Sequence, residues 1–514
     1  MRKLVSLLVL LPFVTMAQQD EISHIELGHE FYEVEDFEKA IMEYEKALQL
    51  DSTEYDAHYY IGKCYYYADK YIESEVKFST YLSIYPEDTN SYFFRGYSRL
   101  QLSKYKESIS DFNRYIEYVD DYSTAYYDRA LCYYFMSENS DTLALAEKDF
   151  TTAIELDDKI ESYYYWRGRS RFDLNIYDKV IEDMSYVILA DPLDTLSYHY
   201  RGYSYLQLQQ YEKSIEDFTA YINFRPDYYL GYYNRGDANQ ALGNYMLSVE
   251  DFTNSIALMD RTDTSSMYFN YFERGLSYYR MEKYRLAIED YNKVIAVEKN
   301  APSAYYNRGL SHHNIGNYPF AIADFTLAIQ IDSTNVDYHY FLSEAYYLSE
   351  QYDKAKVAFE KTLKLDETDI WSHYYYGLSL SELNLSEQAI RYLKKCLEIN
   401  PDFPIAYYSI GVIYSDLGDS DLSIKNLNKS IQINPEYERA IIMRSFVYNG
   451  IANYRKSLTD ANKVLKLNPE NAYAYWLRGL AKNYIGFYDP CPDLNKGCEL
   501  GVGCEDYKTW CEEE

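Results

Sequence analysis

The sequence predicts an all-α protein in which antiparallel helix hairpins follow one another as a solenoid. A small residue returns at a nearly constant interval of 34 residues along the chain. Around it, apolar residues recur at three- and four-residue intervals, which is the spacing of amphipathic helices. A glycine-containing turn, Ile315-Gly316-Asn317, separates two such helices within one period. Because one hairpin cannot bury its apolar face alone, neighbouring hairpins are expected to stack.

The repeated small residue gives the register of the whole chain. Of the thirteen gaps between its occurrences, eleven are 34 residues long and the other two are 38 and 39. We assign the longer gaps to insertions at 137–143, expected in the turn between two helices, and at 260–267, expected between two repeats. The small residues are Gly28, Gly62, Gly96, Ala130, Gly168, Gly202, Gly236, Gly275, Gly309, Ser343, Gly377, Gly411, Ser445 and Gly479.

This pattern resembles the tetratricopeptide repeat. The family's small, aromatic and proline positions are matched by Gly309, Ala321, Phe325 and Ala328 in one repeat and by Gly202, Phe218 and Pro226 in another. The resemblance covers residues 21 to about 500, and it implies a right-handed superhelical solenoid. We divide the chain into a signal peptide at 1–17, thirteen tandem repeats at 21–469, and a divergent last repeat with a cysteine-rich capping helix at 470–514.

The first residues are typical of a signal peptide. Arg2 and Lys3 precede the apolar stretch Leu4–Val14, and Thr15-Met16-Ala17 offers small residues for cleavage. The apolar stretch is too short to span about 30 Å of hydrocarbon as a helix, and no later segment predicts a membrane span. We therefore expect export to a periplasmic or extracellular location, with an uncleaved anchor as the alternative.

The charge and the motifs narrow the function. The 50 basic and 81 acidic side chains give a net charge of −31, so nucleic acid and anionic membrane surfaces are not expected as partners. The sequence contains no recognisable catalytic, cofactor-binding or metal-binding motif. Four histidines occupy a position where other repeats have tyrosine, and we interpret them as packing substitutes: His24, His58, His339 and His373. The sequence therefore predicts a protein that is not an enzyme.

Arginine and aspartate vary together between repeats. Arginine precedes the small residue at Arg95, Arg129, Arg167, Arg201, Arg235, Arg274, Arg308 and Arg444. The same repeats carry Asp111, Asp149, Asp183, Asp217, Asp251, Asp290, Asp324 and Asp460 in the second helix, and the other five repeats lack both residues. An antiparallel hairpin brings the two positions level, so we predict an ion pair within each repeat. Duplication of one ancestral repeat is the rival explanation.

The resemblance implies that the fifth position of each repeat faces the concave groove where the family binds ligands. Aromatic residues at this position form the predicted groove stripe: Tyr59, Phe93, Tyr127, Tyr165, Tyr233, Phe272, Tyr306, Tyr340, Tyr374 and Tyr408, with His199 among them and Ile25 and Ile442 near the ends. Tyrosine offers rigid contact area with a polar tip, which suits peptide recognition. Packing between repeats is the alternative role of these side chains.

Four of the seven cysteines crowd into the last 24 residues. Cys491 and Cys498 are seven residues apart, as are Cys504 and Cys511, so each pair shares one face of a helix. Folding the second helix back onto the first places Cys491 beside Cys511 and Cys498 beside Cys504. Because the chain is expected to be exported, we predict two disulfides that staple a cap onto the last repeat. A zinc site and four free thiols are the alternatives.

These observations lead to two functional hypotheses. The first is an exported scaffold that binds proteins or peptides through the aromatic groove. The second is an architectural spacer of the cell envelope whose groove holds no ligand. The sequence does not indicate an oligomeric state or identify the partner.

Overall fold

The computed structural model describes residues 23–137, 139–259, 264–486 and 489–511. These residues form 29 α-helices and no strand, which confirms the predicted all-α class. The proposed signal peptide lies outside the described residues. The chain divides into two compact units, residues 1–247 and 248–514, and each is described by itself.

The helices of the first unit are short and follow one another with brief connections. They are α1 (His24–Glu33), α2 (Phe37–Leu50), α3 (Asp56–Tyr67), α4 (Tyr71–Ile84), α5 (Thr89–Gln101), α6 (Tyr105–Ile116), α7 (Ser123–Met136), α8 (Ser140–Leu156), α9 (Glu161–Asp173), α10 (Tyr177–Ala190), α11 (Thr195–Gln207), α12 (Tyr211–Phe224) and α13 (Tyr229–Ala241). The boundary between the units falls within α14 (Tyr245–Leu258).

The second unit continues in the same way and ends in two shorter helices. It contains α15 (Thr264–Arg280), α16 (Tyr284–Val297), α17 (Pro302–Asn314), α18 (Tyr318–Ile331), α19 (Val336–Leu348), α20 (Tyr352–Leu365), α21 (Ile370–Glu382), α22 (Ser386–Ile399), α23 (Pro404–Asp416), α24 (Ser420–Ile433), α25 (Glu438–Gly450), α26 (Tyr454–Leu467), α27 (Ala472–Ile485), α28 (Cys491–Glu499) and α29 (Cys504–Cys511).

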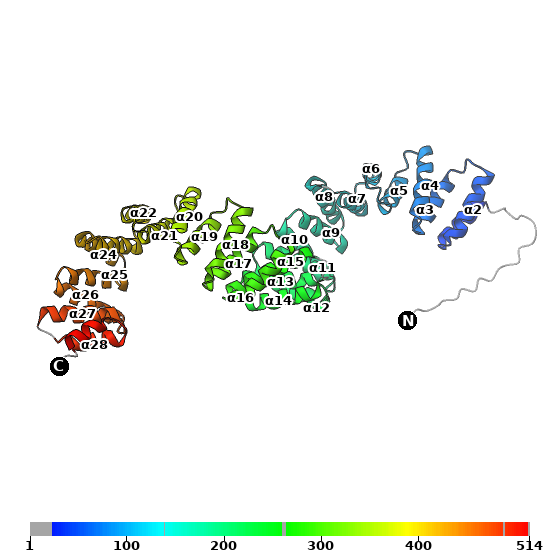
Figure 1. Ribbon diagram of the computed structural model, residues 1–514. Helices are drawn as coiled ribbons and strands as arrows, with labels where there is room; N and C mark the ends of the chain where they lie inside the picture. The colour runs from blue at the N-terminus through cyan, green and yellow to red at the C-terminus, as the bar shows by residue number, and fades with distance from the viewer. Residues whose placement is uncertain (1–22, 138, 260–263, 487–488, 512–514) are drawn as a thin grey trace, which may run out of the picture. The chain divides into compact units, whose positions relative to one another are not determined.

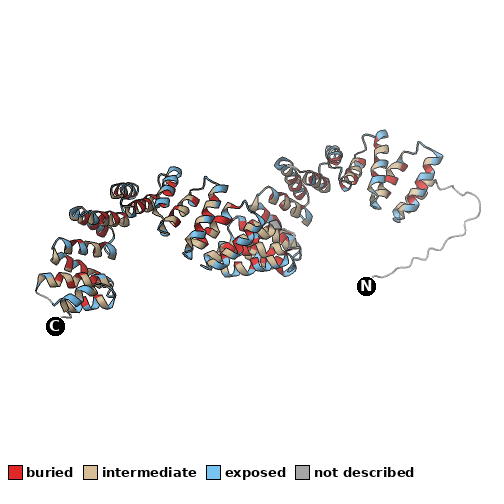
Figure 2. Ribbon diagram, viewed as in Figure 1, coloured by how far each residue is buried: buried red, intermediate tan, exposed pale blue. Residues whose placement is uncertain are grey.

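Within each unit the helices form consecutive hairpins. From α1 to α12 and from α15 to α28, each odd-numbered helix packs against the next helix in the chain, and the second helix of one hairpin contacts the first helix of the following one (Figure 1). The buried residues lie along the helix faces that meet, and the exposed residues lie on the outer faces (Figure 2). Every hairpin therefore depends on its neighbours for part of its buried surface.

The small residue of each first helix allows close approach to an aromatic ring. A Cβ atom at Gly309 would lie 2.7 Å from Cε1 of Phe325 in the second helix of the same hairpin. Phe325 is fully buried, as are Ala321 and Ala328 on either side of it. The 34-residue period thus marks the point where the two helices of each hairpin come closest.

Most of the turns inside the hairpins contain a residue in the left-handed region. Gly316 has a φ of +74°, but most of these turns use residues with a side chain. The non-glycine residues with positive φ are Glu35, Asp69, Ser103, Asn175, Gln209, Glu282, Glu350, Asn384 and Ala452. Because a Cβ atom clashes with the backbone in this region, each of these positions carries local strain.

We expect Ala452→Gly, at a φ of 59°, to stabilise the α25–α26 hairpin by about 1 kcal/mol, since glycine adopts this backbone conformation without the clash. Hydrogen exchange of the amides in α25 and α26 measures the change. Gly316→Ala is the matched control and should destabilise the α17–α18 hairpin by a similar amount. Equal exchange rates in Ala452→Gly and the parent chain would contradict the prediction.

The structure corrects the expected position of the first insertion. The segment 137–143 was expected to form a turn, but α8 begins at Ser140, with Asn139 accepting hydrogen bonds from the backbone of Asp141 and Thr142. The additional residues therefore lengthen the second helix to 17 residues instead of extending the turn. Of the second insertion, residues 260–263 lie outside the described part of the chain, and 264–267 belong to α15.

Two of the four histidines make the hydrogen bond that tyrosine makes in other repeats. The hydroxyl of Tyr92 donates to the carbonyl of Pro86, six residues earlier, at 3.0 Å. Nε2 of His339 lies 3.1 Å from the carbonyl of Ser333, also six residues earlier. Nε2 of His373 lies 2.9 Å from the carbonyl of Glu367. In these three repeats, a polar ring at this position therefore joins the first helix to the loop before it.

Seven of the eight predicted arginine–aspartate pairs lie within one unit, and in each of these the two side chains face each other across their hairpin. Arg308 donates from Nε and Nη2 to the two carboxylate oxygens of Asp324, at 2.9 and 2.6 Å. Bidentate contacts of the same kind join Arg95 to Asp111, Arg129 to Asp149, Arg201 to Asp217, Arg274 to Asp290 and Arg444 to Asp460. In Arg167 the same two guanidinium nitrogens contact Asp183.

The arginines also reach the preceding hairpin. Nη1 of Arg308 donates to the side-chain oxygen of Asn292 in α16 at 2.6 Å, and Nη1 of Arg444 does so to Asn428 in α24 at 2.6 Å. The last hairpin has a pair that the sequence analysis missed, Arg478 with Asp493, because their spacing is 15 residues instead of 16. Arg308 and Arg444 therefore each bond both within their own hairpin and to the hairpin before it.

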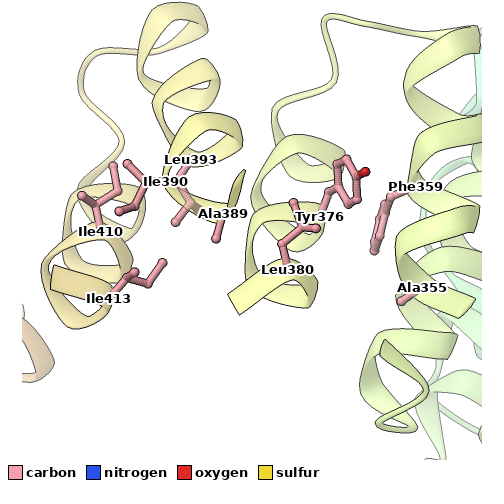
Figure 3. Packing of buried hydrophobic residues seen from close by; sticks show 9 residues of the cluster. All are labelled: Ala355, Phe359, Tyr376, Leu380, Ala389, Ile390, Leu393, Ile410 and Ile413. Carbon is pink, nitrogen blue, oxygen red and sulfur yellow. The ribbon is translucent and has the colours of Figure 1, made fainter. Parts of the chain in front are cut away.

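Three successive hairpins, α19–α20, α21–α22 and α23–α24, pack without the ion pair. At the arginine position they have Leu342, Tyr376 and Ile410. Tyr376 and Ile410 belong to an apolar cluster with Phe359, Leu380, Ile390 and others (Figure 3). Here apolar contacts replace the charged bridge between helices.

Candidate functional site

The predicted groove stripe lies on the first helices of the hairpins, and most of its side chains are half-buried. Phe93 is the exception, because only 8% of its surface is exposed. The other members of the stripe are partly exposed to solvent. The stripe is therefore less open than a continuous groove floor would be.

The packed side of each ring faces the same hairpin and the next one. The ring of Tyr306 lies 6.0 Å from that of Phe325 in the same hairpin and 5.8 Å from that of Phe341 in the following hairpin, between centroids. Tyr59 makes the equivalent contacts with Phe78 and Phe94, at 5.9 and 6.4 Å. These contacts belong to packing between repeats, so only the exposed part of each ring is available to a ligand.

Burial also affects the tyrosine hydroxyls of the stripe. It raises the pKa of Tyr59 and of Tyr127 to about 12, because the phenolate form loses solvation. These hydroxyls therefore stay protonated at neutral pH and can donate a hydrogen bond to a ligand.

The stripe opens into a pocket at the C-terminal end of the second unit. The pocket has a volume of about 670 Å³ and lies across the first helices α23, α25 and α27. Its walls carry aromatic and aliphatic side chains with a few polar groups: Tyr408, Glu438, Arg439, Ile442, Met443, Phe446, Asn471, Tyr473, Trp476 and Leu477. Phe446 and Tyr473 are 47% and 55% exposed, so the pocket presents aromatic surface to solvent.

Three lining residues continue the stripe, and one of them was missed from the sequence. Tyr408 and Ile442 belong to the predicted set, and Trp476 follows Ile442 by one period of 34 residues. Extending the register into the divergent last repeat would have identified it. The ring of Trp476 lies 6.5 Å from that of Phe446, between centroids.

The polar groups of the pocket differ in how they are held. The carboxylate of Glu438 accepts hydrogen bonds from Nδ2 of Asn468 at 3.2 Å and from Nδ2 of Asn471 at 3.3 Å. Arg439 is exposed at the rim. The pocket can therefore accept an apolar side chain while its rim offers polar contacts to a peptide backbone.

The C-terminal cysteines lie in the pairs that the sequence predicts. The sulfurs of Cys491 and Cys511 are 2.07 Å apart, and those of Cys498 and Cys504 are 2.17 Å apart. Both pairs join α28 to α29. The remaining cysteines, Cys64, Cys132 and Cys396, are buried thiols, and burial raises the pKa of each to about 12.

Within the described ranges, no group of three or more His, Cys, Asp or Glu side chains is arranged to hold a metal ion. Over the same ranges, no helix has the length and apolar character needed to cross a membrane.

Several family models match separate stretches of the chain. A model described as a TPR repeat matches residues 28–67 and 275–316. Three models described as tetratricopeptide repeats match residues 302–335, residues 336–369, and residues 197–228, 372–403 and 405–437. No curated relative matches the chain at a significant level.

Solved structures resemble the chain at low identity. The C-terminal part of a TPR repeat-containing protein from Cytophaga hutchinsonii is 19% identical over 54% of this chain and 97% of its own, with a TM-score of 0.37. The Cut9–Hcn1 hetero-tetramer of APC/C is 13% identical over 89% of this chain and 96% of its own, with a TM-score of 0.37. YrrB, described as a TPR protein with an unusual peptide-binding site, is 23% identical over 36% of this chain and 96% of its own, with a TM-score of 0.31.

Proposed function

The chain is a tetratricopeptide-repeat protein, and we propose that it is an interaction scaffold that binds a peptide segment of another protein on its first-helix face. Binding takes place at the C-terminal pocket across α23, α25 and α27. The ligand inserts an aromatic or aliphatic side chain, and its backbone bonds to polar groups at the rim.

The observation that carries this proposal is the pair of exposed rings, Phe446 and Tyr473, in a pocket of about 670 Å³. The ring of Phe325, which packs inside its hairpin, is by contrast fully buried. Exposed aromatic surface in a concave site is instead typical of the anchor residues of protein interfaces. What distinguishes Phe446 and Tyr473 from an exposed ring outside the pocket, such as Phe320, is their concave setting.

We propose in addition that the protein is exported to the periplasm or the cell exterior. The basic and apolar pattern of residues 1–17 supports export, and the two cysteine pairs between α28 and α29 fit an oxidising compartment. In that setting the scaffold acts on proteins of the cell envelope or outside the cell.

A random dodecapeptide display library, panned against the oxidised protein, tests the binding function. We expect peptides with an aromatic or branched aliphatic anchor to be enriched. Phe446→Ala should weaken the binding of these peptides by about fivefold or more, because truncation of a central aromatic contact typically costs at least about 1 kcal/mol. Fluorescence anisotropy of labelled peptides gives the dissociation constants.

Phe320→Ala is the matched control, since Phe320 is also an exposed phenylalanine, on the second helix α18 outside the pocket. It should leave peptide affinity unchanged. Variants of central stripe members such as Tyr306 are less suitable, because its ring also packs between hairpins. If no peptide is enriched, or if Phe446→Ala and Phe320→Ala bind equally well, the spacer hypothesis is favoured.

A further inference from the structure

We infer that Asp506, in the terminal helix α29, is a positioning residue that holds Trp476 in the wall of the pocket, and that it does so only while the two disulfides keep α29 in place. The effect of Asp506 on ligand binding rests on the proposed function of the pocket. The positioning of Trp476 itself can be measured without any ligand.

Trp476 is held from the side of α29 and the loop before it. Its indole Nε1 donates a hydrogen bond of 2.7 Å to Oδ2 of Asp506. Gly503 lies against the same ring so closely that a Cβ atom there would overlap it, and its φ of +76° also favours glycine. The same Trp476 side chain lines the pocket, where the centroid of its ring lies 6.5 Å from that of Phe446. One face of the pocket wall is therefore supported by residues that lie outside the pocket.

The two short terminal helices are attached to the molecule in different ways. Helix α28 is fixed to α27 by Asp493, which accepts hydrogen bonds from Arg478 and lies 2.9 Å from Nζ of Lys482. Leu494 of α28 is fully buried against Gly479. Helix α28 thus has its own ion pairs and apolar contact and does not depend on the cysteines to stay in place.

Among the side chains that the structure describes, those of helix α29 make fewer contacts with the rest of the chain. Both disulfides tie it to α28, and its side-chain contacts with α27 include Trp476 to Asp506 and a ring contact between Tyr484 and Trp510 at 6.1 Å. A helix of eight residues is marginal in isolation. Opening the disulfides should therefore release α29 while leaving α28 docked.

Reduction changes the chain in a defined way. Dithiothreitol transfers two electrons and two protons to each disulfide, which breaks the sulfur–sulfur bond and leaves two thiols, while the two thiols of the reagent join in a ring disulfide. The other three cysteines are already thiols. The reagent therefore acts on the cap alone, after which Trp476 loses both the carboxylate of Asp506 and the packing of Gly503.

The first measurement follows Trp476 in the absence of ligand. Replacing the other three tryptophans by Trp166→Phe, Trp371→Phe and Trp510→Phe leaves Trp476 as the only fluorophore of its kind. We expect dithiothreitol to raise the acrylamide quenching constant of Trp476 by about twofold or more, since local release exposes the ring. Asp506→Leu should do the same in the oxidised protein, and Asp506→Asn should not, because the amide oxygen still accepts the indole hydrogen bond.

The second measurement uses 8-anilinonaphthalene-1-sulfonate as a probe of the pocket. We take the difference in probe binding between the parent protein and Phe446→Ala as the binding at this pocket. Probe bound to apolar surface elsewhere is the same in both proteins and cancels. We expect reduction, or Asp506→Leu, to weaken the binding at this pocket by about fivefold, because one wall of the pocket is no longer fixed. Asp506→Asn should restore it.

Unchanged quenching of Trp476 after complete reduction, verified by mass spectrometry of alkylated thiols, would overturn the inference. Equal quenching in Asp506→Leu and Asp506→Asn would overturn the role of the hydrogen bond. If quenching rises as expected but the oxidised protein shows no binding that depends on Phe446, the positioning of Trp476 stands and the proposed function of the pocket fails.

Discussion

Replacing Asp324 by alanine should destabilise the α17–α18 hairpin by about 3–5 kcal/mol, the range found when one partner of a buried ion pair is removed. Asp324 is only 4% exposed, and the side chain of Arg308 is 19% exposed. Without the carboxylate, the guanidinium remains partly buried with no opposite charge. Hydrogen exchange of the amides in α17 and α18 gives the local free energy of opening, which is the appropriate quantity for a repeat protein that does not unfold in one step.

The chain provides its own control for this experiment. The next hairpin has Leu342 and Ala358 at the positions of Arg308 and Asp324, and it folds without the pair. The double variant Arg308→Leu with Asp324→Ala copies that combination and should cost much less than Asp324→Ala alone. If Asp324→Ala lowers the free energy of opening by less than about 1 kcal/mol, the prediction is wrong and the pair contributes no more than an exposed salt bridge.

Replacing Asp128 by asparagine should stabilise the region around α7 at neutral pH and remove a dependence of its stability on pH. Asp128 is 3% exposed, and its Oδ2 has no hydrogen-bond partner. Burial raises the pKa of Asp128 well above its usual range, because the carboxylate form is poorly solvated there.

The sign of the pH dependence follows from this shift. Below about pH 3.9, the usual pKa of an aspartate, folded and unfolded chains both hold the proton and no penalty exists. As the pH rises, the unfolded chain loses its proton first, so stability falls by up to about 1.4 kcal/mol per pH unit until the pKa of the folded state is reached. Asp128→Asn should match the parent chain near pH 4 and exceed it at pH 7.

Hydrogen exchange of the α7 amides, corrected for the intrinsic exchange rate at each pH, measures this difference. Asp120→Asn is the control, since Asp120 is an exposed carboxylate close by in the chain. Parallel pH profiles for the parent chain and Asp128→Asn would show that Asp128 is solvated or paired in solution.

The regular part of the fold could be predicted because the small residue of each first helix recurs at a fixed distance in sequence from the aromatic residue that packs against it. Gly309 recurs with Phe325 at a constant spacing, and this spacing alone indicates a tight hairpin. The pairing of Cys491 with Cys511 in the structure likewise follows from a seven-residue spacing on two short helices. In both cases the partners lie within one hairpin or between adjacent short helices, so local geometry limits the choices.

What could not be predicted depends on contacts between hairpins or on departures from the repeat. The bond from Arg308 to Asn292 crosses to the preceding hairpin, and asparagine at that position has no pattern as clear as that of Asp324. Asp128 occupies a position where the neighbouring repeats have Phe94 and Trp166, and a single sequence does not show how such an exception is accommodated. The turn expected at 137–143 was wrong for a related reason, since inserted residues can lengthen a helix instead of a loop.

The bonds that the arginines make to the preceding hairpin give the chain a direction that affects how it can be truncated. Arg444 depends on Asn428 before it and on Asp460 within its own hairpin. A fragment that ends after a complete hairpin keeps every remaining arginine with all of its partners. A fragment that begins at a first helix removes one amide partner from its leading arginine and exposes that guanidinium. A shortened version of this protein should therefore be made by removing hairpins from the C-terminal side. If hairpins are removed from the N-terminal side, the fragment should keep the second helix of the hairpin that precedes its first complete hairpin.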